Sequence, residues 1–568
     1  MHLRRSLVIP TVTLVLHACG GGPPSSPPAA QPRGSTPYDV VIEGGIIVDG
    51  TGNAWFPGDL AIRGDRIVRI APAGMLRSRP ATRRVQAAGM VVAPGFIDIQ
   101  SHSRPAFLGS GDGRVVSKVT MGVTTEIMGE ATTNAPAPVG AERPGMTFSG
   151  PRAFDEWIRA MEDHGASVNF GSFVGATTIR VLAKGEAMGP ASEVELDVMK
   201  TAVRNAMEDG AFGIGSALIY PPGNFAGTDE LVQINRAAAP YGGVYITHMR
   251  SEADYFLEAI DEAIEIGTRA GVPVEIYHLK AGGQRNWHKA ALAVAKIDSA
   301  RAAGVDIQAN MYPYTAGGTG LTACFPPWAS ADGALFDNLA DADMRAKIRS
   351  EIENQTEEWE NLCTLATPEG VLLLGLQKPE NRKHRGRRLS AIAADRGTDW
   401  IDTAFDLVLD ERQRIGTIFF MMSEENVAMQ IGVPWIKFGT DAGGLDPAGA
   451  QGLSHPRAYG TFTRILGRYV REEHATTLEE AVRKMSSAVA TRLHIEDRGL
   501  LKEGFFADVV VFEPDVVRDR ATYEEPHQLS EGVRHVFVNG VAVVDEGRHT
   551  GAQPGRPVRG PGWTGRRD

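Results

Sequence analysis

The sequence predicts an α/β protein: a (β/α)8, TIM-like barrel with a small β-sandwich domain built from both termini and a helical insertion after barrel strand 7. Three observations indicate this fold. Apolar runs of strand length alternate with helical stretches from Met90 to about Arg492. Short strands with the same alternating pattern, separated by glycine turns, are found at both ends of the chain. The last two barrel strands are too far apart for a single crossover connection.

Eight apolar runs form the predicted barrel strands, and most are followed by a helical stretch. They cover residues 91–102, 124–130, 168–174, 212–218, 243–248, 274–278, 305–312 and 435–441. The barrel domain is expected over residues 91–495, with its active site at the carboxyl ends of the strands. Residues of about 325–415 are too many for a crossover, so we expect a helical subdomain there, lying over the barrel mouth.

The two ends of the chain share one pattern. Residues 38–90 and 496–550 lack helical periodicity and consist of short alternating strands separated by glycine turns. Their matching length and pattern favour one composite β-domain, into which the barrel is inserted. Residues 551–568 are rich in Pro, Gly and Arg, and we expect this tail to be poorly ordered.

The N-terminal residues indicate an export signal. A basic start with Arg4 and Arg5 precedes an apolar run over residues 7–16, so residues 1–18 are interpreted as a signal peptide. Leu16-His17-Ala18-Cys19 resembles a bacterial lipobox, which implies lipid attachment to Cys19; His17 is uncommon there, so simple secretion stays open. Residues 19–37 form a Gly/Pro/Ser-rich tether. We expect an exported lipoprotein of the periplasm or cell envelope, with the lipid as its membrane contact.

Composition and charge exclude some functions. The net charge of −11, the pI near 5.8 and the lack of a basic run give no support for nucleic-acid binding. No apolar run is long enough to cross a membrane as a helix. Cys324 and Cys363 could pair, but two lone cysteines in a large domain are expected to stay unpaired.

Two histidines stand at the carboxyl ends of successive predicted strands. His248 closes one apolar run, His278 closes the next, and an amphipathic helical stretch over residues 251–270 lies between them. In a parallel barrel they converge with the polar residues that end strands one, two and eight, namely Gln100, His102, Glu130 and Asp441. Imidazoles and carboxylates in this arrangement suit a divalent metal, above all zinc. An aspartate beside the metal can accept a proton from activated water.

Longer motifs around these residues resemble a known family. Pro94-Gly-Phe-Ile-Asp98, the strand-end residues and the split β-domain resemble the amidohydrolase superfamily. Three segments resemble its N-acyl-D-amino-acid deacylases (D-aminoacylases): Tyr245-Ile-Thr-His248-Met-Arg250, Met311-Tyr312-Pro-Tyr314 with Gly317, and His455-Pro-Arg457 followed by Tyr459-Gly-Thr-Phe. The resemblance covers roughly residues 38–550. It implies zinc-dependent hydrolysis of an N-acyl-D-amino acid to a carboxylate and a free amino acid, with Asp441 as general base and acid.

The chain departs from the family pattern at two positions. The family places His-x-His on strand one, where this chain has Gln100 before His102, and a cysteine after strand two, where this chain has Glu130. The resemblance then implies one tight zinc site made of Glu130, His248 and His278, with Glu126, deeper in the barrel, as the rival to Glu130. A weak second site keeps His102 and Asp441 but has lost a histidine. Because an amide is a poor zinc ligand, we predict a single functional zinc.

The substrate site is also predicted by resemblance. Lys280, Tyr312 and Arg457 are expected to bind the carboxylate of the substrate, a small N-acyl amino acid or related amide. Arginine suits a carboxylate because its planar fork can bind both oxygens. Gly318 stands where the family has a serine, which leaves the amino-acid preference open.

Other functions stay open at this point. The enzyme could be a dipeptidase, a cyclic amidase or a hydrolase of amide-linked xenobiotics, and the chain could also be a non-catalytic exported binding protein. Strand four lacks a lysine, which argues against the cyclic amidase, whereas the retained ligands and Asp441 argue against the binding protein. The acyl group, the D or L configuration and the oligomeric state are not determined by the sequence.

Overall fold

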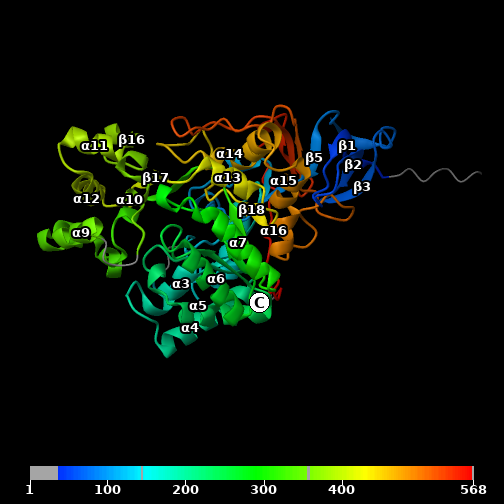
Figure 1. The fold of residues 1–568 in the computed structure, drawn as a ribbon. Helices are drawn as coiled ribbons and strands as arrows, with labels where there is room; N and C mark the ends of the chain where they lie inside the picture. Colours follow the sequence, from blue (N-terminus) through cyan, green and yellow to red (C-terminus); the bar gives the residue numbers. More distant parts are fainter. Residues whose placement is uncertain (1–35, 142–144, 355–358, 566–568) are drawn as a thin grey trace, which may run out of the picture.

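A computed structural model describes residues 36–141, 145–354 and 359–565. Figure 1 shows three parts in a row: the β-domain (blue), a central barrel, and the insertion (yellow-green) on the side away from the β-domain. The expected signal peptide, the lipobox and most of the tether fall within residues 1–35 and lie outside the described residues.

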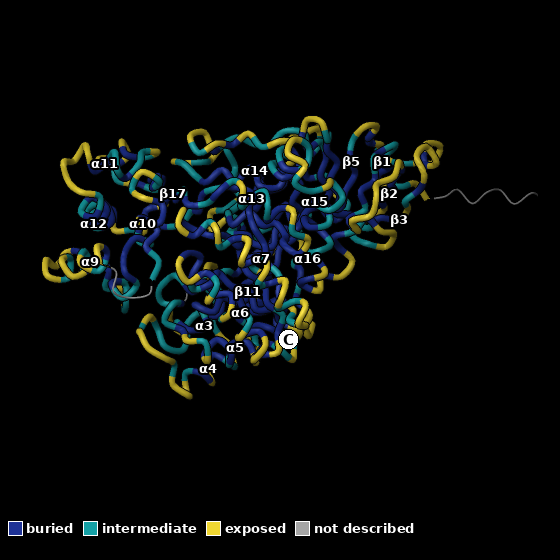
Figure 2. Tube along the Cα trace, in the orientation of Figure 1, coloured by how far each residue is buried: buried dark blue, intermediate teal, exposed yellow. Residues whose placement is uncertain are grey.

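The predicted barrel is confirmed. Its strands are β6 (Phe96–Asp98), β7 (Val123–Met128), β8 (Asn169–Ser172) continued by β9 (Val174–Gly175), β10 (Gly213–Ala217), β11 (Val244–His248), β12 (Val274–Ile276), β13 (Ile307–Met311) and β18 (Ile436–Phe438). They pair in parallel in the orders β6-β7-β8 and β9-β10-β11-β12-β13-β18. Nearly all of their residues are buried, because helices or side chains cover both faces of the strands. Figure 2 shows this as a dark blue centre.

The first predicted strand, residues 91–102, is in fact two strands of different sheets. β5 (Val91–Pro94) joins the β-domain, where it pairs with β1 (Tyr38–Ile47) and β19 (Val509–Phe512). The chain then turns at Gly95 into β6 of the barrel. A Cβ at Gly95 would lie 2.2 Å from the Thr124 hydroxyl, so the turn requires glycine. Both pieces are apolar and buried, so the sequence pattern does not reveal the change of sheet.

Asp98 fixes the first barrel strand against the last. Its Oδ1 accepts from the Thr440 backbone N–H at 2.9 Å, and its Oδ2 accepts from the buried Lys118 Nζ at 2.7 Å. Beyond it, the Asp441 N–H donates to the Gln100 carbonyl at 2.8 Å. These bonds bring the ends of β6 and β18 to the same edge of the barrel.

Helices surround the barrel, as Figure 1 shows. They are α1 (Val116–Val119), α2 (Ala153–His164), α3 (Ala176–Lys184), α4 (Glu193–Glu208), α5 (Thr228–Ala238), α6 (Phe256–Ala270), α7 (Lys289–Ala302), α13 (Glu424–Ile431), α14 (Arg457–Arg464), α15 (Leu478–Met485) and α16 (Ser487–Arg492). α6 links β11 to β12, and it ends at Gly271, whose φ of 74° suits glycine.

The start of α6 differs from the expected residue 251. Ser251 to Tyr255 form a loop, and the helix begins at Phe256. Glu360 of the insertion holds this loop, accepting from the backbone N–H groups of Glu252 at 2.8 Å and Ala253 at 2.7 Å. A carboxylate distant in sequence therefore takes the donors that a longer helix would have used.

The insertion is α/β rather than helical, and it is longer than predicted. Its helices are α8 (Leu335–Ala340), α9 (Ala342–Asn354), α10 (Leu362–Ala366), α11 (Leu389–Arg396) and α12 (Trp400–Glu411). Its sheet has the order β14-β17-β15-β16, with β14 (Ala316–Gly320), β15 (Val371–Leu373), β16 (Arg387–Arg388) and β17 (Gly416–Phe420). The insertion thus runs from β14 to β17. These strands are short, and β14 is mostly glycine, so they lack the period-two pattern.

Cys324 and Cys363 form a disulfide, contrary to the expectation that they stay unpaired. Their Cα atoms lie 5.2 Å apart, although the residues are 39 positions apart in sequence. Both are buried in the apolar core of the insertion. The pairing follows from the tertiary contact between α10 and the segment after β14, which no local pattern shows.

The β-domain joins both ends of the chain in one sheet. In the described residues it has nine strands, which also include β2 (Phe56–Arg63), β3 (Arg66–Pro72), β4 (Ala81–Gln86), β20 (Val533–Val538), β21 (Val541–Asp545) and β22 (Arg548–His549). The antiparallel pair β5–β19 connects the N-terminal strands to the C-terminal ones.

The tail, expected to be poorly ordered, lies along the barrel as far as it is described, to residue 565. The Gly555 N–H donates to the Ala166 carbonyl at 2.8 Å, and the Val558 N–H donates to the Phe170 carbonyl at 2.7 Å. Main-chain bonds of this kind hold an extended segment without any apolar periodicity, so composition alone was a poor guide.

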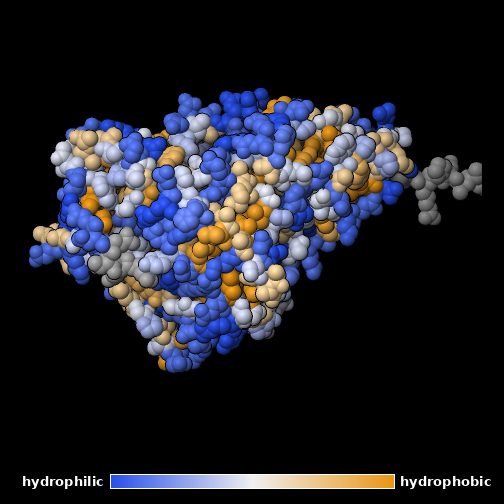
Figure 3. Space-filling model, in the orientation of Figure 1, coloured by the Kyte–Doolittle hydropathy of each residue, from blue (hydrophilic) through white to orange (hydrophobic). Residues whose placement is uncertain are grey.

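The outer surface is mixed in character. On the face drawn in Figure 3, hydrophilic side chains predominate and hydrophobic ones form patches between them. Within the described ranges, no helix combines the length and the apolar character needed to span a bilayer.

Candidate metal centre and active site

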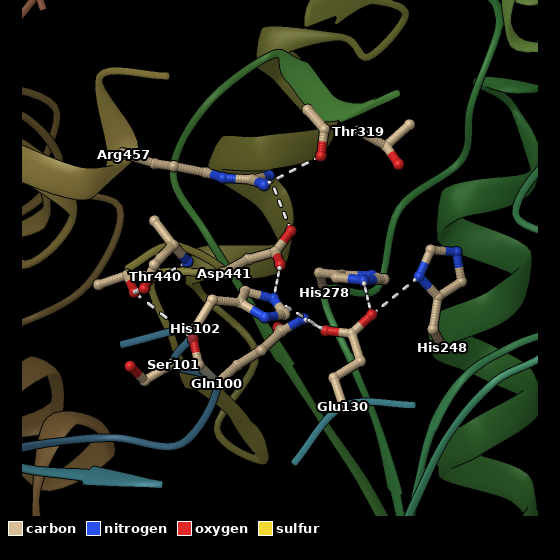
Figure 4. Close-up of polar contacts among 12 residues, drawn as sticks. Gln100, Ser101, His102, Glu130, His248, His278, Thr319, Thr440, Asp441 and Arg457 are labelled. Carbon is tan, nitrogen blue, oxygen red and sulfur yellow. Dashed lines mark hydrogen bonds and ion pairs between the residues drawn. The ribbon is translucent and has the colours of Figure 1, made fainter. Parts of the chain in front are cut away.

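The structure brings the three residues of the first predicted ligand group together. Glu130 follows β7, His248 ends β11, and His278 follows β12. Glu130 Oε1 lies 3.2 Å from His248 Nδ1 and 3.5 Å from His278 Nε2. Figure 4 shows both imidazole rings next to this carboxylate.

These separations fit a tetrahedral zinc ion. Ligand atoms held about 2.0–2.1 Å from zinc at tetrahedral angles are about 3.3 Å from one another. One carboxylate oxygen and two imidazole nitrogens are also donor types that zinc prefers. The lone pairs of this oxygen and these nitrogens repel one another at such distances unless a cation or a proton lies between them. The residues therefore fit the metal that the sequence predicted.

Glu252 lies behind both histidines and was missed by sequence reasoning. Its Oε1 is 2.9 Å from His278 Nδ1, and its Oε2 is 3.5 Å from His248 Nε2. A carboxylate that accepts from the outer ring nitrogen fixes the tautomer whose inner nitrogen can bind a metal. The only sequence signal was its place four residues after His248. That spacing does not predict a contact, because the intervening residues leave the strand for a loop.

A second group shares Glu130 with the first. His102 Nε2 lies 2.9 Å from Asp441 Oδ1 and 3.4 Å from Glu130 Oε2. Gln100 Nε2 donates a hydrogen bond of 2.7 Å to the same Oε2, as Figure 4 shows. The amide thus directs a donor at an oxygen that a second metal ion would need. Gln100 orients Glu130 instead of acting as a ligand.

Mutual neutralisation sets the protonation states of these groups. Burial would raise the pKa of Glu130, but hydrogen bonds from the three histidines hold it well below its usual range. Burial would lower the pKa of His102, but hydrogen bonds to Asp441 and Glu130 raise it to about 9. Burial and the nearby Lys280 charge would lower the pKa of His278, but the adjacent carboxylates raise it to about 9. Metal binding therefore has to displace protons from imidazole.

Asp441 is poised as a base. Its Oδ2 forms an ion pair of 2.7 Å with Arg457, at the start of α14. Burial would raise the pKa of Asp441, but the charge of Arg457 and the hydrogen bond from His102 lower it, so the carboxylate is ionised. His455 positions this arginine, since its Nδ1 accepts from the Arg457 N–H at 3.1 Å.

Arg457 and Tyr312 keep unused donors at the cavity. Among the described residues, Arg457 Nε and the Tyr312 hydroxyl are buried without a hydrogen-bond partner. Arg457 Cζ lies 4.7 Å from the centre of the Tyr312 ring. Buried donors require an acceptor, and a substrate carboxylate would supply it. Gly318 borders this site, and a Cβ there would lie 3.5 Å from Arg457, where the family serine would stand.

Lys280 has different surroundings from those that its predicted role requires. Its Nζ lies 2.6 Å from Glu252 Oε1 and 2.8 Å from His278 Nδ1. Its charge is therefore already balanced by a carboxylate. Lys280 does line the cavity, so substrate binding stays a prediction, but its contacts indicate support of the residue behind the zinc ligands.

The predicted metal ligands, Asp441 and the substrate-site residues line one cavity of about 470 Å³, which is a typical size for a ligand site. The strand ends of the barrel form its floor. The insertion forms a wall, with lining residues from β14, α10 and β17 that include Gly317, Thr319, Leu362 and Phe419. The insertion therefore shapes the substrate site, as its predicted place at the barrel mouth requires.

Two site residues have left-handed backbones. The φ angle is 33° at His278 and 49° at Asp441. For residues other than glycine this region costs about 1–2 kcal/mol. Side-chain and main-chain bonds hold it, since the His278 N–H donates to Asn310 Oδ1 at 3.0 Å and the Asp441 N–H donates to the Gln100 carbonyl. Such strain is often found at functional sites.

Comparison with known proteins assigns the family. The model of the Amidohydrolase family matches residues 437–544. D-aminoacylase of Alcaligenes xylosoxydans xylosoxydans is 33% identical over 530 residues, which cover 92% of this chain and 98% of that protein. The chain belongs to the D-aminoacylase family of amidohydrolases. The family predicted from the motifs is thus confirmed.

Two solved structures of D-aminoacylase family proteins match the fold. One is N-acyl-D-glutamate deacylase from Bordetella bronchiseptica, complexed with zinc and a phosphonate inhibitor that mimics the tetrahedral intermediate. Its TM-score is 0.76 at 30% identity, over 92% of this chain and 100% of that chain. The other is a D-aminoacylase with a binuclear metal centre, described as showing one-metal activation and second-metal attenuation, with a TM-score of 0.76, 30% identity and the same coverage.

Proposed function

We propose that this D-aminoacylase family member hydrolyses N-acyl-D-amino acids, with one zinc held by Glu130, His248 and His278. One observation carries the proposal: His248 Nδ1 and His278 Nε2 lie 3.2 and 3.5 Å from Glu130 Oε1, and Glu252 lies behind the two histidines. The choice of a D-configured amide rests on the relatives, a D-aminoacylase and an N-acyl-D-glutamate deacylase. The products are a carboxylate and a free amino acid.

Asp441 carries the proton transfers in this proposal. Zinc, when bound, supplies a Lewis acid for the amide carbonyl and lowers the pKa of water towards ~7. Ionised Asp441 accepts the proton of the attacking water and returns it to the leaving nitrogen. His102 holds Asp441 Oδ1 at 2.9 Å, which fixes the direction of the carboxylate.

The α-carboxylate of the substrate is proposed to bind Arg457 and Tyr312. The unpaired Arg457 Nε and Tyr312 hydroxyl support this role, since both are buried donors without a partner among the described residues. The scissile amide then lies between this anion site and the three zinc ligands.

A second metal ion has no part in the proposed reaction. The hydrogen bond of 2.7 Å from Gln100 to Glu130 Oε2 supports this, because the donor competes with a cation for the same oxygen. His102 and Asp441 remain as a weak pair of ligands, which is too few for a tight site.

Zinc content and substrate specificity test the proposal together. We expect about one zinc per chain and turnover of N-acetyl-D-amino acids but not of the L forms. Asp441→Asn is expected to keep the zinc and to lower kcat about 10²–10⁴-fold. A protein that binds no zinc, or a variant with unchanged activity, would refute the mechanism. A preference for L substrates or dipeptides would change the substrate and leave the chemistry standing.

We also propose that the enzyme is an exported lipoprotein of the periplasm or cell envelope, anchored through Cys19. The basic start, the apolar run and the lipobox-like segment support this. The Cys324–Cys363 disulfide supports an oxidising compartment. Membrane fractionation tests it: the wild-type protein should sediment with membranes, and Cys19→Ala should not. Wild-type protein in the cytoplasm with an intact N-terminus would contradict export.

A further inference from the structure

A second cavity adjoins the active-site cavity between the barrel and the insertion. It has a volume of about 420 Å³, and four residues line both spaces: Ile219, Tyr220, Pro221 and Arg414. The first three follow β10, and Arg414 precedes β17 of the insertion. None of the four is buried, so no packed layer of side chains closes the boundary. We call this second cavity the side chamber.

Apolar side chains form most of the side chamber. The loop after β10 contributes Ile219 and Pro221, and the insertion contributes Phe325, Leu335, Phe336 and Trp359. The indole N–H of Trp359 donates to Glu351 Oε1 at 3.1 Å, so the one polar atom of this side chain already has a partner. A concave and mostly apolar space of this size is typical of a ligand site. The side chamber therefore suits an apolar group.

The charged residues of the side chamber disfavour an anionic occupant. Within the described part of the chain they are Glu186, Glu360 and Arg414. Glu360 accepts from the backbone N–H groups of Glu252 at 2.8 Å and Ala253 at 2.7 Å, which hold its carboxylate in place. Two carboxylates against one exposed arginine repel a negative charge. An acidic side chain or a dicarboxylic acyl group is therefore a poor occupant.

The side chamber lies across the barrel from the proposed α-carboxylate site. The barrel strands follow one another in the order β6, β7, β8 with β9, β10, β11, β12, β13 and β18. A bridge between Ser101 and Ala442 closes the ring from β18 back to β6. The loop after β10 is thus half a turn around the barrel from the end of β18, where Arg457 pairs with Asp441.

The zinc ligands stand between these two sides. Figure 4 shows Arg457 and Asp441 on one side of Glu130 and His248 on the other. The Tyr220 ring packs edge-on against His248, with 5.3 Å between the ring centres. Because Tyr220 also lines the side chamber, the chamber begins next to a zinc ligand.

The geometry of an amide decides which part of the substrate faces the side chamber. A planar trans amide directs its acyl chain away from the Cα on the nitrogen side. With the α-carboxylate at Arg457 and Tyr312, the amino-acid side chain branches from the Cα on that same side. The acyl chain leaves the scissile carbonyl in the opposite direction, toward the loop after β10.

We propose that the side chamber binds a long apolar acyl group, so that the enzyme prefers N-acyl-D-amino acids with fatty acyl chains. The proposal rests on the deacylase function proposed above and names its substrate class. Hydrolysis of such a substrate releases a fatty acid and a free amino acid. The hydroxyl of water joins the acyl carbon, the C–N bond breaks, and the remaining proton of water goes to the amine.

Three substrates and matched variants test this proposal. N-octanoyl-D-alanine carries a long acyl group, N-acetyl-D-tryptophan carries a large apolar side chain, and N-acetyl-D-alanine carries neither. Ala323→Phe fills the side chamber from the insertion, and Ser330→Phe fills it from a second position. Ala346→Phe makes the same enlargement on the exposed face of α9, outside both cavities, and is the control. Thermal unfolding checks that each variant folds, and Ser330→Phe replaces Ala323→Phe if that variant does not.

The wild-type enzyme is expected to prefer N-octanoyl-D-alanine over N-acetyl-D-alanine about 10- to 100-fold in kcat/KM, because each buried methylene contributes about fourfold. Ala323→Phe should lower this preference at least about tenfold, since a filled chamber leaves the added methylenes in water. Ala346→Phe should retain it. Equal kcat/KM values for the two acyl groups in the wild-type enzyme would overturn the proposal. A loss confined to N-acetyl-D-tryptophan in Ala323→Phe would also overturn it, because the chamber would then hold the side chain.

Binding to the zinc-free protein separates this proposal from the deacylase function. Calorimetry should show tighter binding of N-octanoyl-D-alanine than of N-acetyl-D-alanine, with the more negative heat-capacity change that marks apolar burial. Ala323→Phe should abolish both differences. If the zinc enzyme hydrolyses none of the compounds while these differences persist, the deacylase function fails and the acyl site stands. If hydrolysis occurs without any binding difference, the side chamber is not the acyl site.

Discussion

The two ligand groups of this enzyme share Glu130, yet their surroundings are opposite. The side chains of His248 and His278 are 6% and 3% exposed, and Glu252 accepts from the outer nitrogen of His278. The side chain of His102 is 38% exposed, and Gln100 and Arg457 direct donors at the oxygens of its group. Residue types alone therefore do not define a metal site. What the neighbouring groups offer to each lone pair decides whether a cation fits.

Glu130 shows this difference within a single side chain. Its Oε1 faces two imidazole nitrogens, whereas its Oε2 accepts from an amide. A cation at Oε1 replaces protons on histidine, but a cation at Oε2 would have to displace a neutral donor that cannot lose its proton. The structure thus favours one ion over two.

Removing a ligand from each group should give the largest contrast. His278→Asn is expected to lose the zinc and with it at least about 10³-fold in kcat/KM, since polarisation and water activation both depend on the metal. His102→Asn should keep the zinc and lose about tenfold through poorer orientation of Asp441. Zinc measured by plasma emission distinguishes the two. Loss of zinc in the His102 variant would show that both groups hold the ion.

Glu252→Gln tests the support behind the first group. The substitution removes the carboxylate that accepts from His278 and balances Lys280. Zinc affinity should fall about 10- to 100-fold, as is usual when an outer carboxylate partner of a ligand histidine is lost. Competition with a chromogenic chelator measures it. The matched change Glu360→Gln lies next to the same loop and should leave zinc affinity nearly unchanged.

The pH dependence of zinc affinity should report on the first group. The pKa of His278 in the metal-free protein is raised to about 9, so below this pH the imidazole holds a proton that zinc must displace. Affinity is expected to fall about tenfold for each pH unit below about 9 per proton displaced, and to level off above it. Chelator competition between pH 6 and 10 checks the sign. An affinity that rises as the pH falls would contradict the ligand assignment.

Gln100→His should convert the second group into a metal site. The new imidazole adds a third ligand beside His102 and Asp441 and removes the donor from Glu130 Oε2. We expect a second, weaker zinc per chain and a loss of about severalfold in kcat in excess zinc, because Asp441 would become a ligand rather than a free base. Titration calorimetry counts the ions. A variant that still binds one zinc would show that Gln100 does not limit the second site.

Much of the fold was predictable because each barrel strand can be recognised from a short, contiguous stretch of sequence. Runs such as the one ending at His248 are short, apolar and followed by helical periodicity, and they fell close to the observed strands. The ligand residues were predictable for the same reason, since they stand where each run ends. The strands of the insertion were not, because β14 is made mostly of glycine and β16 of two arginines.

The failures share one physical cause. The Cys324–Cys363 bond, the docking of the tail on the barrel and the contact of Glu252 with His278 all join segments that are distant in the chain or separated by a loop. Each depends on the position of a partner in space. Neither periodicity nor composition carries that information.

The sequence by itself determined the order of barrel strands, the residues at their ends and the family. These follow from the period of the apolar pattern and from motifs that are contiguous in the chain. Only the tertiary structure decided which oxygen of Glu130 faces a metal and that Glu252 supports the histidines. The physical reason is that a metal or an anion is selected by the direction of individual lone pairs and N–H groups, and those directions are set only when the strand ends meet.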